Sequence, residues 1–244
     1  MVVGECLGAL YFVLILSVQG RTERIWLLAY GSSGAIYACL LRLLDGTLHP
    51  ARYAVKRGIT GRINEEESMA HEALMYYAPS SVVPLVGRVY SKGMLSGIIT
   101  KYMPSDFHNF IARLRREFGD PVDRWSVHPH VVRWYTVDIL VKLLQIHLSG
   151  FCHSDIKSEN ILVDEDGYIC FTDFGACKEE SEENWRKEVH GTAYTTAPER
   201  LDGNGIWDGP RWPADLWSVG VIMHDLLFGD TVGHYSFLLF HTNQ

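Results

Sequence analysis

Short apolar runs separated by turn residues dominate the first part of the chain. Residues 25–30 and 35–44 are mostly apolar, residues 52–57 place apolar side chains among basic ones, and the three runs are separated by Gly31-Ser32-Ser33-Gly34 and by Asp45-Gly46-Thr47. Runs of this length that end at glycine or other turn residues predict β-strands. We therefore expect a three-stranded antiparallel meander here.

A helix and two further strands are predicted next. In residues 64–77, Asn64 precedes three glutamates, and Pro79 follows the last apolar position. Asparagine caps helix N-termini, acidic side chains suit the positive end of the helix dipole, and proline ends helices. Residues 85–90 and 97–102 are again short apolar runs around a glycine turn. The first part of the chain is thus predicted to contain one helix and a five-stranded antiparallel sheet.

The pattern changes to a helical period beyond residue 105. Residues 106–118 form one amphipathic stretch, and residues 131–149 carry apolar side chains at intervals of three and four. This spacing is typical of helices that bury one face. Gly150 ends the longer helix, so the second part of the chain is predicted to be mainly helical.

Four polar residues stand among apolar ones just after this helix. Asp155, Lys157, Asn160 and Asp173 flank two strand-like runs, which are joined by an acidic turn with glycine at residues 164–167. Carboxylate and amide oxygens suit a hard divalent cation, a carboxylate can orient a hydroxyl, and a lysine can offset charge on a transferring phosphate. The pattern predicts a hairpin that carries a metal and phosphate site.

These residues resemble a known family. His153-x-Asp155-x-Lys157-x-x-Asn160, followed by Asp173-Phe174-Gly175, resembles the catalytic loop and metal loop of eukaryotic protein kinases. The resemblance implies that Asp155 and Lys157 are catalytic and that Asn160 and Asp173 hold Mg²⁺. It also implies an α+β, two-lobed protein-kinase-like fold, with a small lobe at residues 23–103 and a mainly helical large lobe at 104–244.

The same resemblance implies an ATP site in the small lobe. Gly31, Gly34 and Ile36 match the kinase glycine-rich loop, Ala29 replaces its first glycine, and Lys56 follows at the distance of the phosphate-binding lysine. A tight hairpin turn would explain the glycines equally well. The residues implied to contact ATP are Leu28, Gly31, Gly34, Ile36, Ala54, Lys56, Glu72, Tyr102 and Met103.

Two of these assignments depend on the family pattern alone. In kinases a glutamate of the small-lobe helix pairs with the strand lysine; Glu72 is the first choice here, and Glu66 and Glu67 remain alternatives. Thr100 matches the residue at the back of the nucleotide pocket. Tyr102 and the residue after it resemble the hinge between lobes, where backbone groups meet the adenine.

The segment after the metal loop favours a protein substrate. Residues 178–188 are highly charged, and residues 191–199 resemble the Gly-Thr-x-x-Tyr-x-x-Pro-Glu end of a kinase activation segment. Lys157 and Thr192 favour serine or threonine over tyrosine as the acceptor. Asp215 stands at the start of an apolar helix and is expected to accept hydrogen bonds from the catalytic-loop backbone. The alternative is that Asp215 caps this helix, and both can be true.

Composition excludes several classes of function. The formal net charge of -7 supplies no basic excess for a nucleic-acid partner. Eleven histidines form no zinc-binding spacing, so magnesium is the expected metal. The five cysteines have no paired spacing, which suits a reducing compartment and a cytoplasmic or nuclear location. They are Cys6, Cys39, Cys152, Cys170 and Cys177.

The N-terminal segment has an uncertain role. Residues 7–18 form an apolar run of about 12 residues, shorter than the roughly 20 that span a bilayer. We expect a buried or irregular segment within residues 1–22; a cleaved signal, a membrane anchor or a wrongly assigned start are the alternatives.

The C-terminal part is expected to be an incomplete large lobe. Kinase large lobes continue for several helices beyond the buried one, whereas only residues 224–244 follow its middle here. We therefore expect a C-terminally truncated domain that exposes apolar side chains, aggregates and is poorly active alone, unless the tail repacks or a partner covers these side chains. A pseudokinase that binds nucleotide or partners without catalysis is the alternative function, favoured by Ala29 and by Ser154, which replaces the usual arginine. The side chains expected to lose their cover are Val219, Val221, Ile222, Leu226 and Leu227.

Overall fold

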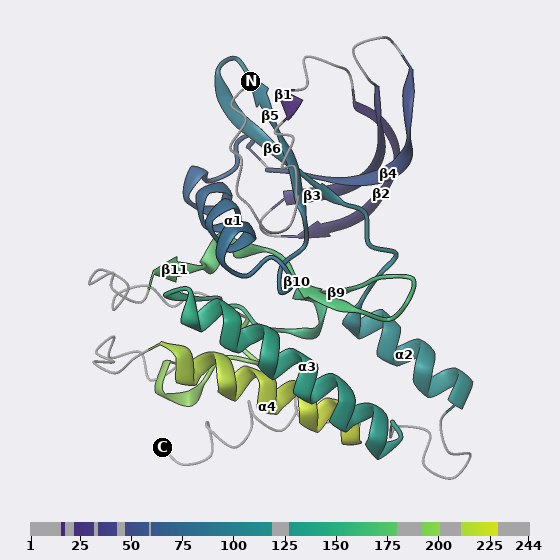
Figure 1. Cartoon of the computed structure of the whole chain (residues 1–244), viewed down its shortest axis with the longest axis vertical. Helices are drawn as coiled ribbons and strands as arrows, with labels where there is room; N and C mark the ends of the chain where they lie inside the picture. The colour runs from purple at the N-terminus through teal and green to yellow at the C-terminus, as the bar shows by residue number, and fades with distance from the viewer. Residues whose placement is uncertain are drawn as a thin grey trace, which may run out of the picture. The chain divides into compact units, whose positions relative to one another are not determined.

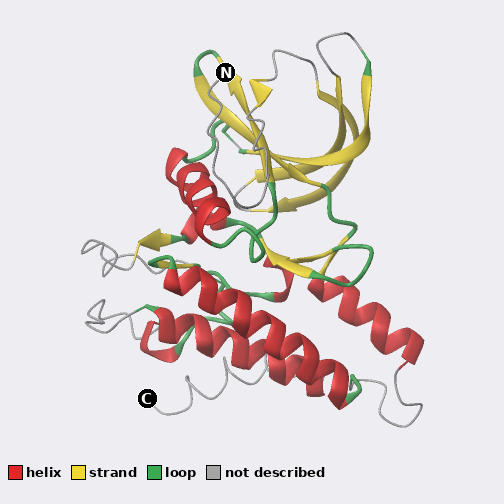
Figure 2. Ribbon diagram, viewed as in Figure 1, coloured by secondary structure: helices red, strands yellow, loops and turns green. Residues whose placement is uncertain are grey.

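Two compact units make up the computed structural model, which describes residues 16–17, 22–31, 34–42, 47–58, 60–118, 127–179, 192–200 and 211–228. The first unit comprises Met1–Ile63 and Pro84–Tyr102, and the second comprises Asn64–Val83 and Met103–Gln244. Figure 1 traces the elements of each unit, and Figure 2 colours them by type.

The first unit is a sheet of the five predicted antiparallel strands. They are β2 (Thr22–Gly31), β3 (Gly34–Arg42), β4 (Leu48–Arg57), β5 (Leu85–Ser91) and β6 (Met94–Lys101). Their spatial order is β5-β6-β4-β3-β2, so the predicted meander of β2, β3 and β4 is confirmed. A sixth strand, β1 (Leu16–Ser17), adds to the sheet in parallel with β5; the sequence did not predict it.

Turn chemistry and alternation explain this sheet. Lys92 and Gly93 both have positive φ, 51° and 77°, which is the backbone that a two-residue hairpin loop requires. On one face of the sheet, Cys39, Leu41 and Ile99 form a small core with Val55. Because side chains alternate along a strand, these residues are buried on one face, whereas the residues next to them along each strand point to the opposite face.

Helix α1 (Glu65–Tyr77) lies in the second unit rather than with the sheet. The Asn64 side chain accepts a hydrogen bond from the backbone N–H of Glu66 at 3.0 Å, so the predicted cap is confirmed. Leu74, fully buried, joins the large apolar cluster of the second unit. Val82 bridges to Phe171, which ties the end of this segment to the same unit. The predicted small lobe at residues 23–103 differs from the first unit by this helix.

The second unit contains the predicted long helices and a set of short strands. The helices are α2 (Phe107–Phe118), α3 (Pro129–Leu148) and α4 (Trp212–Phe228). The strands are β7 (Ser105–Asp106), β8 (Phe151–Cys152), β9 (Ile161–Val163), β10 (Ile169–Phe171) and β11 (Lys178–Glu179). Single 3₁₀ turns occur at Ser158–Asn160, Phe174–Ala176 and Pro198–Arg200. The α+β class is thereby confirmed, and among the described residues no helix is long and apolar enough to span a bilayer.

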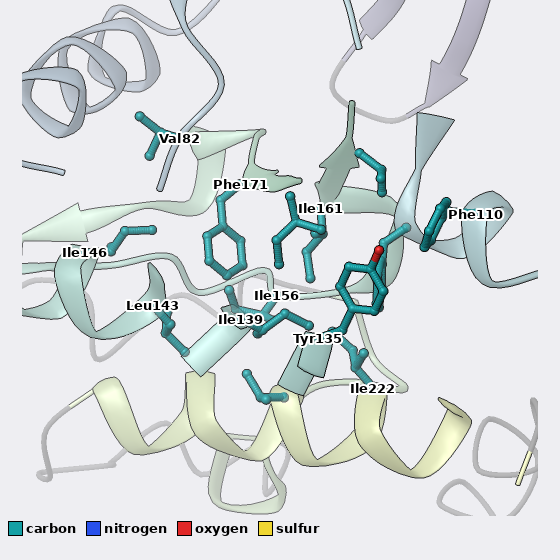
Figure 3. Close-up of a cluster of buried hydrophobic side chains, with 14 of the residues drawn as sticks. Val82, Phe110, Tyr135, Ile139, Leu143, Ile146, Ile156, Ile161, Phe171 and Ile222 are labelled. Atoms are coloured by element: carbon teal, nitrogen blue, oxygen red, sulfur yellow. The ribbon is translucent and has the colours of Figure 1, made fainter. Parts of the chain in front are cut away.

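One apolar core holds the second unit together. Ile139, Leu143 and Ile146 on α3 form one apolar cluster with Phe171 of β10 and Ile222 of α4 (Figure 3). These five side chains are each at most 3% exposed. Their spacing on α3 follows the helical period, as the sequence predicted.

The expectation that α4 loses its packing partners is wrong. Val219, Val221, Ile222 and Leu226 are between 1% and 7% exposed, and Leu227 is half-buried against the core. Val219, Ile222 and Leu226 lie in the same apolar cluster as Ile139, Leu143 and Ile146 of α3. The exposed apolar side chains of the two helices face the other way, and they include Trp134, Val141, Leu144, Leu148, Trp212 and Trp217.

Several segments with sequence predictions lie outside the described residues. They are most of the N-terminal apolar run, residues 32–33 of the glycine loop, the turn at 45–46, the predicted break at 119–121, most of the charged stretch 178–188 and the chain after Phe228.

Leu143→Ala is expected to lower the free energy of unfolding by about 2–5 kcal/mol, because Leu143 is fully buried and its truncation leaves a cavity. Leu144→Ala is the control, since Leu144 is 55% exposed and should change stability by less than about 0.5 kcal/mol. Urea unfolding of both variants measures the difference. Equal losses would contradict the assignment of this core.

Candidate active site

The candidate site is built on the predicted hairpin. Strands β9 and β10 pair antiparallel, with Ile161 opposite Phe171, so the hairpin is confirmed. The Asp164 carboxylate closes the turn by accepting hydrogen bonds from the backbone N–H groups of Asp166 and Tyr168, at 3.0 and 2.9 Å. Gly167 has φ +87°, a conformation that suits glycine. The hairpin places one site residue before β9 and another after β10.

Asp155 is the centre of a dense hydrogen-bond network. Its Oδ2 accepts from Lys157 Nζ at 2.8 Å and from Asn160 Nδ2 at 2.9 Å. Its Oδ1 accepts from the Thr192 hydroxyl at 2.9 Å, and Lys157 Nζ also donates to Thr192 Oγ1 at 2.8 Å. The structure thus brings together three residues that the sequence assigned to this site, Asp155, Lys157 and Asn160. It adds Thr192, whose role in this network the sequence reasoning missed.

The Thr192 position had a sequence signal. The threonine directly follows the glycine of the activation-segment motif, but only the chain path shows that its hydroxyl meets Asp155. Three bonds fix the Asp155 carboxylate in one orientation. A carboxylate accepts about four hydrogen bonds, so Oδ1 keeps a lone pair that no described residue fills.

Asp215 anchors the loop that carries Asp155. Its Oδ2 accepts from the His153 backbone N–H at 2.9 Å, and its Oδ1 accepts from the Ser154 N–H at 2.8 Å. The expectation that Asp215 bonds the catalytic-loop backbone is therefore confirmed. Ser154 itself has φ +65°, which is unusual for a residue other than glycine and marks a strained turn directly before Asp155.

Asn160 and Asp173 have the donors for a divalent cation. Asn160 is 5% exposed, and its Nδ2 donates hydrogen bonds to both the backbone oxygen and the carboxylate of Asp155. The amide oxygen of Asn160, Oδ1, is therefore left for another partner. The Thr172 N–H donates to the Asn160 backbone oxygen at 3.0 Å, so the residue before Asp173 is tied to Asn160. Asp173 has a left-handed backbone, φ 61°. This pair of oxygen donors fits Mg²⁺.

Phe174 fixes the loop behind Asp173. Its ring packs between the His71 and His153 rings, with centroid distances of 4.8 and 5.4 Å. His153 is fully buried and its Nε2 lies 3.0 Å from the Thr172 backbone oxygen. His71, on α1, lies 2.7 Å from the Val83 backbone oxygen. The metal loop is thereby joined to both α1 and the catalytic loop.

Helix α1 presents a different glutamate from the one expected. Glu72 is exposed, whereas Glu67 is 8% exposed and belongs to the buried face of the helix. A Cβ added to Gly175 would lie 3.5 Å from Glu67 Oε2, so Glu67 faces the metal loop. Glu72, the first choice as partner of the strand lysine, is therefore exposed, whereas Glu67, an alternative that the spacing had left open, is buried; the partner of the lysine stays a prediction. A helix turns about 100° per residue, so two glutamates five positions apart lie on different faces.

The proposed nucleotide residues of the first unit share one face of the sheet. Ile36 pairs with Lys56, and Lys56 pairs with Ile98 on the next strand. Ala54 pairs with Thr100. Residues directly opposite each other in an antiparallel sheet point to the same side, and so do residues two apart on one strand. Ile36, Ala54, Lys56 and Thr100 therefore line one face.

The glycine loop is a hairpin tip whose glycine at position 34 is required sterically. Gly31 pairs with Gly34, and a Cβ on Gly34 would lie 2.1 Å from the Arg57 backbone oxygen. This close approach explains Gly34 without a phosphate. Leu28 lies at a bulge between β2 and β3, and it is 39% exposed. Tyr102 and Met103 are half-buried and lie where the first unit ends and the second begins.

A tyrosine contact near Asp155 was not predicted. The Tyr194 hydroxyl donates to both carboxylate oxygens of Glu159, each at 3.0 Å. Burial raises the pKa of Tyr194 well above its usual value, and the negative charge of Glu159 raises it further. The contact holds the segment at 192–200 against the catalytic loop.

Comparison with known proteins supports the family resemblance. The family described as "Protein kinase domain" matches residues 27–236. Rho-associated protein kinase 1 of Oryctolagus cuniculus is 31% identical over 157 residues, which are 60% of this chain and 11% of that protein. Serine/threonine-protein kinase AtPK1/AtPK6 of Arabidopsis thaliana is 37% identical over 99 residues, 41% of this chain and 20% of that protein.

A third relative extends the comparison. The RAC family serine/threonine-protein kinase homolog of Dictyostelium discoideum is 39% identical over 100 residues, 40% of this chain and 22% of that protein. The matched stretch therefore spans less than a quarter of the length of each of these three relatives.

The hydrogen bonds of Tyr194 are expected to make the free energy of unfolding depend on pH in the alkaline range. Because the folded-state pKa of Tyr194 is raised above about 10, its stabilising contribution is complete below pH 10 and is lost as the pH rises toward the folded pKa. The free energy of unfolding of the wild type should thus fall more steeply above pH 10 than that of Tyr194→Phe. Urea unfolding across this range measures it, with Tyr168→Phe, at an exposed tyrosine, as the control. Parallel curves for wild type and Tyr194→Phe would contradict the prediction.

Proposed function

Because the chain belongs to the protein kinase domain family, we propose that it transfers the γ-phosphate of ATP to serine or threonine hydroxyls of protein substrates. The observation that carries the proposal is the network of Asp155, Lys157, Asn160 and Thr192. In this network, hydrogen bonds hold the Asp155 carboxylate, the Lys157 ammonium and the Asn160 amide together in fixed orientations.

Asp155 is the residue that would accept the proton of the substrate hydroxyl. Two bonds at Oδ2 and one at Oδ1 orient its carboxylate, and the remaining Oδ1 lone pair can accept a hydroxyl. Lys157 Nζ, 2.8 Å from Oδ2, keeps a positive charge beside the carboxylate and the incoming phosphate. Preorganised charge of this kind stabilises the transition state because it needs no reorganisation during the reaction.

Asn160 and Asp173 are the residues that would hold Mg²⁺, whose positive charge would offset the negative charge of the ATP phosphates. Lys56 would contact the α- and β-phosphates. The sheet face that carries Ala54 and Thr100 beside Lys56 supplies apolar and small side chains for the adenine. Tyr102 and Met103 would offer backbone groups to the same ring.

Serine or threonine is the favoured acceptor because of the contact between Lys157 and Thr192. The lysine donates to both the Asp155 carboxylate and the threonine hydroxyl, which closes the catalytic loop onto the segment at 192–200. A small cavity beside Asp155 is lined by both segments, including Ser154, Thr196 and Arg200. This segment is the part of a kinase that positions a peptide, which supports a protein substrate rather than a small molecule.

A binding function without catalysis is the rival hypothesis. Ser154 replaces the usual arginine and Ala29 replaces a glycine, yet neither residue takes part in the Asp155 network. The complete network favours catalysis. The substitutions below separate the two, since a binding-only protein would transfer no phosphate in any variant.

Asp173→Ala is expected to abolish magnesium-dependent phosphate transfer, and Lys56→Met is expected to lower kcat/KM by at least about 100-fold, because they remove a metal ligand and a phosphate contact. Transfer from radiolabelled ATP to a generic basic protein measures both. Asp166→Ala and Lys92→Met, at exposed turn positions, are the matched controls and should keep wild-type turnover. Wild-type turnover in Asp173→Ala and Lys56→Met would show that the site is misassigned.

Phosphorylation of Thr192, Thr195 or Thr196 is not expected to act as an arginine-linked on-switch. Ser154 cannot form the bidentate pair that an arginine makes with a phosphate. All three threonine hydroxyls already donate hydrogen bonds inside the protein, at 2.9 to 3.1 Å. Phosphatase treatment of an active preparation should leave its turnover unchanged. Loss of activity on dephosphorylation, restored by rephosphorylation at one of these threonines, would refute this prediction.

A further inference from the structure

Three side chains of different chemistry converge behind the catalytic loop. His147 comes from the last turn of α3, Cys152 from β8 and Asp215 from α4. The imidazole nitrogen, the thiol sulfur and a carboxylate oxygen all lie within 4.8 Å of one another. Among the described residues this is the cluster of three such groups close enough to share one metal ion.

We propose that His147, Cys152 and Asp215 form a zinc-binding site behind the catalytic loop. Nitrogen, sulfur and oxygen donors together suit Zn²⁺, because it is of borderline softness and accepts all three in a tetrahedral site. Mg²⁺ prefers oxygen ligands alone, so the site is chemically distinct from the pair of Asn160 and Asp173. Sequence spacing did not predict it.

The distances fit a tetrahedral ion after small side-chain shifts. Zinc bonds of about 2.0 to 2.3 Å place neighbouring donors about 3 to 4 Å apart. His147 Nε2 and Asp215 Oδ2 are already 2.9 Å apart. The Cys152 sulfur lies within 4.8 Å of both atoms, so a rotamer adjustment of about an ångström brings it into range.

Burial and charge favour a bound divalent cation. The side chains of His147 and Asp215 are 13% and 2% exposed, and Cys152 as a residue is 2% exposed. A neutral imidazole, a thiolate and a carboxylate carry a charge of about -2 together, which zinc neutralises in this poorly solvated place. The partial exposure of His147 gives the ion a route from solvent.

The surrounding backbone already orients one ligand. The His153 and Ser154 N–H groups donate to the two oxygens of Asp215, which is the kind of outer contact that fixes metal-binding carboxylates. A zinc ion would take the place of the proton between His147 Nε2 and Asp215 Oδ2, and that proton would move to Nδ1 of the neutral ring. Because Asp215 also anchors the catalytic loop, occupancy of this site is coupled to the position of Asp155.

The binding step balances with one proton released. The Cys152 thiol loses its proton to the buffer as the sulfur–zinc bond forms, and His147 binds through the lone pair of neutral Nε2. A water molecule can complete the coordination, as in zinc sites with three protein ligands. No oxidant or reductant takes part.

Cobalt titration of the metal-free full chain tests the proposal, because a cobalt–thiolate bond gives a charge-transfer absorption band. We expect one equivalent of Co²⁺ to produce this band and Zn²⁺ to remove it. Cys152→Ser and Cys152→Ala should abolish the band, and His147→Gln should weaken Zn²⁺ binding by more than about 100-fold. Cys170→Ser, at a buried cysteine outside the cluster, is the matched control and should retain the band.

Calorimetry of zinc binding in two buffers of different ionisation enthalpy counts the released protons. About one proton per zinc at a pH where His147 is neutral is expected. The alanine variant keeps the test valid if the serine variant misfolds, and circular dichroism reports on both. A band that persists in Cys152→Ala, equal loss in Cys170→Ser, or no stoichiometric band in the wild type would overturn the proposal. The readout is the metal–thiolate bond, so it stands whether or not the chain transfers phosphate.

Discussion

The second unit depends on the carboxylate of Asp215. From a buried position on α4, it accepts the backbone N–H groups of both His153 and Ser154 and lies beside His147 of α3. A buried carboxylate is costly unless its oxygens are paired, and here three donors meet that requirement. The strained turn at Ser154 is held in place by these bonds. The position of Asp155, one residue further along, follows from this anchor.

Polar and apolar contacts around the site support each other. The apolar core formed by α3, α4 and β10 brings Asp215 beneath the loop, and the hydrogen bonds of Asp155 then fix the loop to the segment at 192–200. Phe174 joins both systems, because its ring packs against His153 while its neighbour Asp173 offers an oxygen donor. Removing either kind of contact would therefore disturb the other.

The two glutamates Glu72 and Glu67 illustrate a general limit of predicting helix contacts from sequence spacing. Both residues lie in α1, and the sequence permitted each of them as the partner of a strand lysine. Their distance from Lys56 along the chain did not separate them, whereas the helix face shows which of the two is buried. Likewise, the apolar side chains of α4 were expected to be exposed because later helices were thought necessary to cover them. Val219, Ile222 and Leu226 instead lie in the same apolar cluster as Leu143 of α3.

The sequence by itself determined the local elements. Alternation of apolar residues, caps and turn glycines predicted the five antiparallel strands and the helices, because these signals act over a few residues. The sequence also predicted the hairpin that links Asp155 and Asn160 to Asp173. Only the tertiary structure decided which α1 glutamate is buried, that Thr192 bonds Asp155, and that His147, Cys152 and Asp215 converge. These contacts join residues as many as 68 positions apart. Their partners are chosen by helix orientation and chain path, which short-range periodicity does not encode.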